Sequence, residues 1–149
     1  MNTKQFVGTL DPAQIAAAIS AAERRTSGQI RVFVTHRSVD DDVLARARAR
    51  FAKLGMEKTA ARNGVLVYLA PESRKFAVVG DQGIHERCGG DEFWQRIVGE
   101  TMRPRLREGR FTEAIVAAVG EVGAVLAEHF PPLPGGAGAN ELPDEVAED

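Results

Sequence analysis

The chain has 149 residues, of which 44% are hydrophobic and 27% charged, and its formal net charge is −2, a composition typical of a globular domain. The near-neutral charge argues against general nucleic-acid binding, and the lack of a signal-peptide segment or a run of about 18 apolar residues predicts a cytoplasmic protein without a membrane span. The single cysteine, Cys88, excludes an internal disulfide and a cysteine zinc cluster within one chain.

The first predicted elements are a helix, a strand and a second helix. Asp11 can cap the first helix, which Gly28 ends, and the apolar side chains between them recur at helical spacing. Residues 29–37 have a period of two with an apolar side chain on the second face as well, so we expect a strand with both faces partly covered. The second helix follows Asp40 or Asp41 as its N-cap residue.

Two apolar segments then lie on either side of a short turn. Residues 65–70 (VLVYLA) are apolar apart from the Tyr68 hydroxyl, which is typical of a central strand covered on both faces. Residues 71–74 have turn chemistry, and residues 75–79 return as a third strand. We therefore expect the first two strands to be parallel and the third to be antiparallel to the second.

The rest of the chain is predicted to hold two more helices and a tail. Asp91 can cap a helix that breaks near Pro104, and Thr112 can cap a long last helix. The elements together predict an α/β fold, a three-layer α/β/α sandwich with a Rossmann-like mixed sheet, a β-hairpin and about four helices. This domain covers residues 1–130. Residues 131–149 are rich in Pro and Gly, contain five acidic residues and no Lys or Arg, and are predicted to form a flexible acidic tail.

The most informative polar feature is the glycine loop at residues 80–83 (GDQG), which follows the third strand. Glycine permits positive φ, so the loop backbone could fold around an ion and offer carbonyl oxygens. Asp81, Glu86 and Asp91 or Glu92 could add the carboxylate oxygens that Ca²⁺ or Mg²⁺ prefers. The structural alternative is that Asp81 makes an Asx turn and Asp91 caps a helix, and the spacing alone leaves both readings open.

Two other features also have both a chemical and a structural interpretation. Residues 40–42 are three aspartates at the expected carboxyl end of the first strand, where ligands of open α/β sheets bind, but one of them is needed as a helix cap. The hairpin places Asp81 at the opposite end of the sheet, so we expect no shared site. Cys88, next to Arg87, is either a reactive thiol of low pKa or a half-buried loop residue.

Three segments of the chain resemble the TPM domain family. They are SGQIRVFV, RNGVLVYLAPESRKFAVVGDQGIHE and REGRFTEAIVAAVGEVGAVLAEHF, in that order within residues 27–131. The resemblance implies an α/β/α sandwich and divalent-cation binding in an acidic pocket, and some plant relatives are described as acid phosphatases. It carries the cation site onto Asp81, Glu86 and Asp91. One departure is Gln29, where many relatives have Glu.

These observations lead to three hypotheses of function. The first is a small module that binds Ca²⁺ or Mg²⁺ at the glycine loop and serves as a binding or interaction domain. The alternative is a metal-dependent phosphomonoesterase, in which a cation would polarise the phosphoryl group and Arg62 or Lys58 would hold the phosphate, although the sequence offers no evident nucleophile with a paired base. The third is a protein whose acidic tail docks onto a partner chain. The sequence does not specify an oligomeric state.

Overall fold

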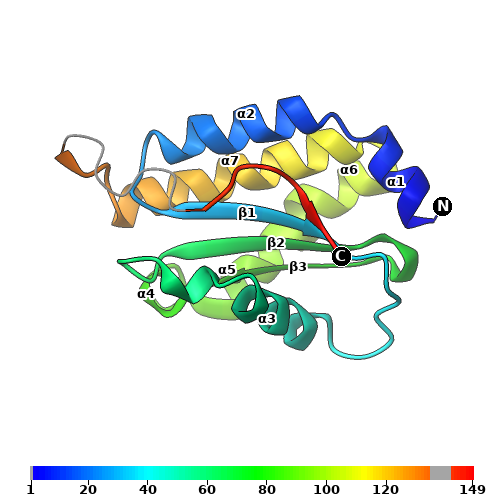
Figure 1. The fold of residues 1–149 in the computed structure, drawn as a ribbon, viewed down its shortest axis with the longest axis horizontal. Helices are drawn as coiled ribbons and strands as arrows, with labels where there is room; N and C mark the ends of the chain where they lie inside the picture. Colours follow the sequence, from blue (N-terminus) through cyan, green and yellow to red (C-terminus); the bar gives the residue numbers. More distant parts are fainter. Residues whose placement is uncertain (1, 135–141) are drawn as a thin grey trace.

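The centre of the molecule is a four-stranded mixed sheet, seen in a computed structural model that describes residues 2–134 and 142–149 (Figure 1). The spatial order is β3-β2-β1-β4. The strands are β1 (Gln29–Val34), β2 (Gly64–Ala70), β3 (Lys75–Gly80) and β4 (Ala147–Glu148). β1 is parallel to β2 and to β4, and β3 is antiparallel to β2. The predicted directions of the first three strands are thus confirmed.

Helices cover both faces of this sheet, as the α/β/α prediction requires (Figure 1). They are α1 (Thr3–Thr9), α2 (Pro12–Glu23), α3 (Val43–Lys53), α4 (Gln82–His85), α5 (Gly90–Arg96), α6 (Arg103–Arg107) and α7 (Phe111–His129), with a π-helical stretch (Ile97–Met102) joining α5 to α6. The long helices α2 and α7 pack together on one face, and α3 covers the other. Among the described residues, none of these helices has the length and hydrophobicity needed to cross a bilayer.

The two faces of the sheet carry two separate hydrophobic cores. One face of the sheet packs against α2 and α7, and it carries Ile30 and Val32 together with their β2 partners Val65 and Val67. Phe33 and Leu66 lie on the opposite face, which packs against α3. Every residue of β2 is buried, because both of its faces are covered. Burial on both faces explains why this strand has an apolar sequence without alternation.

Helix starts were predicted with mixed success. Asp11 caps α2 as expected, and its side chain accepts a hydrogen bond from the Gln14 backbone N–H at 3.0 Å. The prediction of Asp40 or Asp41 as the cap of α3 was wrong, because Asp42 is the last extended residue and accepts from the first-turn N–H groups.

The caps of the two later helices also differ from the prediction. Asp91 lies inside the first turn of α5, which starts after Gly89, a residue with left-handed φ of 105° that turns the chain into the helix. Thr112 lies in the first turn of α7 after Arg110, and its hydroxyl instead accepts a hydrogen bond from the Asp11 backbone N–H.

Two elements of the structure were not predicted. α1 is a seven-residue helix with a capping box between Asn2 and Gln5. β4 lies within residues 131–149, which we had expected to be a flexible tail: the end of this segment instead pairs with the edge of β1. Residues 135–141 of the predicted tail lie outside the described residues.

Candidate functional site

The predicted ligand Asp81 follows β3 directly and forms an ion pair with Arg62. Its side chain is 6% exposed and accepts hydrogen bonds from Arg62 Nε at 2.7 Å, from Arg62 Nη2 at 2.8 Å and from the Gln82 backbone N–H at 2.7 Å. The hydrogen bond to Asp81 raises the pKa of Arg62. Both carboxylate oxygens are therefore already used, one of them also as the cap of α4.

The glycines of the loop serve packing and not an unusual backbone conformation. Neither Gly80 nor Gly83 has positive φ, so the loop does not use the left-handed conformation that glycine permits. A Cβ on Gly80 would lie 2.5 Å from the ring of Trp94, and one on Gly83 would lie 2.4 Å from the Arg62 carbonyl oxygen. The loop is tightly packed, and its backbone does not encircle an open site.

The other two predicted ligands do not join Asp81 in a cluster. Glu86 ends α4 and is exposed, and Asp91 accepts from Arg48 Nη2 at 2.7 Å. Within residues 2–134 and 142–149, no three His, Cys, Asp or Glu side chains come together as a metal site. As arranged here, these residues do not fit a preformed site for a divalent cation, because two of the three carboxylates are paired with guanidinium groups.

The aspartates at residues 40–42 lie at the far end of the sheet from Asp81. Gly80 is opposite Val65 at the start of β2, whereas residues 40–42 follow the carboxyl end of β1. Asp42 caps α3 and Asp41 pairs with Arg46 at 3.2 Å. The expected separation of the two carboxylate clusters is confirmed.

Cys88 is half-buried, and its thiol donates a hydrogen bond to the His85 carbonyl oxygen. Burial raises the pKa of the Cys88 thiol, and the raised value contradicts the alternative of a reactive thiolate.

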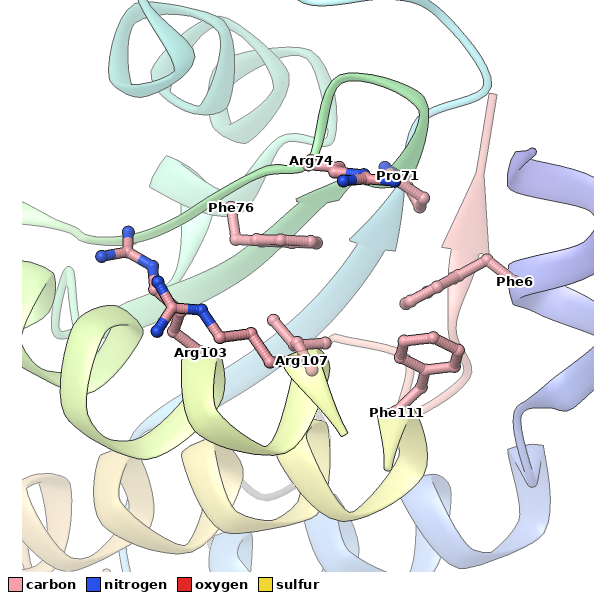
Figure 2. Close-up of a pocket in the computed structure, with 8 residues that line it drawn as sticks. Phe6, Pro71, Arg74, Phe76, Arg103, Arg107 and Phe111 are labelled. Carbon is pink, nitrogen blue, oxygen red and sulfur yellow. The ribbon is translucent and has the colours of Figure 1, made fainter. Parts of the chain in front are cut away.

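The structure forms a different site at the other end of the molecule, in a cavity of about 500 Å³ between α1, α6 and the β2–β3 turn (Figure 2). We call it the arginine pocket. Its lining consists of three arginines, three phenylalanines, a leucine and a proline: Arg74, Arg103, Arg107, Phe6, Phe76, Phe111, Leu106 and Pro71. In Figure 2 the phenylalanine rings point into the space between Arg74, on the turn, and the two arginines of α6.

The three arginines of the pocket are exposed and have no carboxylate partner among the described residues, unlike Arg48 and Arg62. Arg74 also holds a left-handed backbone with φ of 52°, a conformation that costs free energy in a residue with a side chain. Three positive charges thus face one cavity without compensation, which favours an anion.

The remaining lining of the arginine pocket is apolar. Phe6 and Phe111 contact each other with ring centroids 4.8 Å apart, and no Ser, Cys, His, Asp or Glu lines the cavity. The pocket can therefore supply hydrogen-bond donors, positive charge and an aromatic surface, but no nucleophile or general base.

This pocket was not predicted from the sequence. One signal was present: Arg103 and Arg107 are four residues apart, so a helix places them on one face. The contributions of Arg74 and Phe6 could not be inferred, because only the tertiary fold brings residues 6, 74 and 107 to one cavity.

Comparison with known proteins agrees with the fold. The family model described as TPM domain matches residues 3–125. The NMR structure of the BA42 protein from the psychrophilic bacterium Bizionia argentinensis is 32% identical, with a TM-score of 0.80, and the match covers 95% of this chain and 96% of that one. The N-terminal domain of a P. gingivalis protein is 25% identical, with a TM-score of 0.67 and coverage of 83% and 82%. No curated protein matches the chain.

Proposed function

The chain belongs to the TPM domain family, and we propose that this member is a binding module that holds a small organic anion in the arginine pocket. The observation that carries the proposal is the set of three guanidinium groups, without carboxylate partners in the described chain, around a cavity lined with phenylalanine. The proposed ligand is a phosphate monoester or carboxylate attached to an aromatic or aliphatic body.

Each part of the lining selects one part of that ligand. A guanidinium presents a planar fork of donors that matches two oxygens of a phosphate or carboxylate. The rings of Phe6, Phe76 and Phe111 give an apolar body a surface that an inorganic ion would leave unused. The volume, about 500 Å³, lies within the usual range of small-molecule sites.

Calorimetric titration with phenyl phosphate tests the proposal. We expect saturable binding that weakens with added salt and is tighter than binding of inorganic phosphate. Arg103→Ala and Arg107→Ala should each raise the Kd by about tenfold, the effect of losing one or two kcal/mol of charge-assisted hydrogen bonding. The matched control is Arg105→Ala, since Arg105 lies on the same helix but donates to the Thr101 carbonyl oxygen and is outside the lining.

Absence of saturable binding, or equal losses in the Arg105→Ala control and the two pocket variants, would contradict the anion proposal. Binding of inorganic phosphate as tight as that of phenyl phosphate would contradict the role given to the aromatic lining.

Metal-dependent phosphomonoesterase activity remains the alternative proposal. Phenyl phosphate is itself a phosphomonoester, so release of phenol with and without a chelator tests it on the same sample. Because no nucleophile or general base lines the arginine pocket, we expect the compound to be bound there and not hydrolysed. Hydrolysis that a chelator stops would favour the alternative.

Binding of Ca²⁺ or Mg²⁺ by Asp81, Glu86 and Asp91 also stays a prediction, supported by the sequence pattern and the family resemblance. An ion would have to displace Arg62 from Asp81 and Arg48 from Asp91, so binding should be weak. The measurement is an NMR titration of the wild type and of Asp81→Asn, which keeps the shape of the side chain. Unshifted amides at residues 80–92 in the wild type, or equal shifts in the variant, would refute the site.

A further inference from the structure

Residues 142–149, which we call the strap, lie along the edge of β1 (Figure 1). Ala147 is opposite Phe33 and Glu148 opposite Val34 in the parallel pair. At the start of the strap, the Leu142 backbone N–H donates to Gln29 Oε1 at 3.1 Å. The strap therefore covers the end of the β1 edge, where it pairs with Phe33 and Val34.

The charged side chains of the strap meet opposite charges on the body of the domain. Asp149 accepts hydrogen bonds from the Thr35 hydroxyl and the His36 backbone N–H, and Arg50 Nη2 lies 3.5 Å from one of its oxygens. Glu148 pairs with the His36 ring at 2.7 Å. The Glu148–His36 pair is exposed and contributes little, whereas the Arg50 and Asp149 side chains are only 18% and 10% exposed, so the end of the strap is held by one exposed and one largely buried ion pair.

One contact of the strap is of a different kind, because it joins two acids. Glu23, at the end of α2, is 7% exposed, and its carboxyl group lies next to that of Asp144 in the strap. Glu23 Oε2 accepts from the Ile30 backbone N–H at 3.0 Å, whereas Glu23 Oε1 and Asp144 Oδ1 are buried and meet no donor among the described residues. Two carboxyl groups can hydrogen-bond to each other only when one of them carries a proton.

We propose that the strap is a reversible cover of the β1 edge and that a proton shared between Glu23 and Asp144 holds it in place. When both groups are ionised, two negative charges face each other in a buried contact, and undocking lets each return to water. The edge of β1 is then free.

The expected direction with pH follows from the pKa of Glu23, which burial and then the hydrogen bond to Asp144 raise from 4.5 to about 9 in the docked state. The proton is therefore bound more tightly when the strap is docked. The contribution of Glu23 to docking is fully present below about pH 4.5 and is lost as the pH rises to about 9, with the ratio of undocked to docked chains growing by at most about tenfold per pH unit.

Other titratable groups lie near this contact and determine the controls. Among the described groups on α2, β1, α7 and the strap, Asp144 is the one whose charge acts on Glu23. Arg31 of β1 lies near Glu145 of the strap, and burial lowers the pKa of its guanidinium while the Glu145 charge opposes that shift. His36 pairs with Glu148 of the strap, so the experiment is carried out in a His36→Gln background, which removes this second ionisable contact.

The test is methyl NMR of the full chain across about pH 5 to about pH 9.5, which brackets the docked pKa of Glu23. The methyl groups of Leu142, Val146 and Ala147 pack against the two cores and report docking. We expect their shifts to move toward unstructured values with rising pH, while the methyl groups of Leu69 in the core stay constant. Asp144→Asn supplies an N–H donor to Glu23 and should reduce the pH response several-fold.

The matched control is Glu145→Gln, at the residue after Asp144. Its strap methyl shifts should respond to pH as those of the His36→Gln background do. Strap methyl shifts that do not respond to pH in the background protein, or an Asp144→Asn variant that titrates as the background does, would overturn the proposal. If Asp144→Asn does not keep the Leu69 shifts of a folded core, Glu23→Gln replaces it with the same expected outcome.

Discussion

Gly83 occupies a position where a side chain has no room. A Cβ there would lie 2.4 Å from the carbonyl oxygen of Arg62 and 2.5 Å from that of Ala61, and both atoms belong to the backbone. The Gly83 N–H also donates to the Arg62 carbonyl at 2.8 Å. This close approach brings the loop against the residue whose side chain holds Asp81, so the glycine supports the ion pair without touching it.

We therefore predict that Gly83→Ala destabilises the protein by roughly 2–3 kcal/mol, because overpacking against backbone cannot be relieved by a rotamer change. The matched substitution is Gly120→Ala, at an exposed position of α7 with no atom within 4 Å of the added Cβ. It should stabilise by up to about 1 kcal/mol through helix propensity. Urea denaturation midpoints measure both, and equal midpoints for the two variants would show that the contact at Gly83 is unimportant.

β4 is the shortest of the described elements, and we expect it to affect self-association of the chain. It is two residues long and covers the end of β1, where Phe33 and Val34 are buried. An uncovered strand edge with apolar side chains is a template for pairing with another chain.

A chain truncated after residue 141 should consequently associate through β1, since the main domain keeps both cores but loses the strap. Sedimentation velocity at several protein concentrations measures this, with the full chain as the control. We expect concentration-dependent dimers or larger species in the truncated chain only. A truncated chain that stays monomeric over the same range would mean that β1 is protected by something other than the strap.

For the molecule as a whole, the sequence predicts the elements that carry strong periodicity and misses those that depend on contacts from far away. β1, β2 and β3 follow from apolar runs and turn residues, and α2 and α7 follow from helical spacing. β4 could not be predicted in the same way, because two residues show no period and the strand exists through its pairing with β1.

The same division applies to the candidate sites. The position of Asp81 after β3 was predictable, as was its separation from residues 40–42. The partner of Asp81 was not predictable. The sequence does not indicate whether Arg62 pairs with Asp81, as it does in the structure, or binds a phosphate. The arginine pocket is even harder to predict from the sequence. Its lining residues are scattered between positions 6 and 111, and they come together only once α1, α6 and the β2–β3 turn have their places in the fold.

Trp94, the single tryptophan of the sequence, is fully buried beside Gly80, and its indole N–H donates to His85 Nδ1 at 3.3 Å. It does not line the arginine pocket. The single tryptophan thus lies at the glycine loop, and neither tryptophan nor tyrosine lines the pocket. An ion that rearranges the loop should change the emission, whereas phenyl phosphate in the pocket should leave it unchanged, so an unlabelled sample can distinguish the two candidate sites optically.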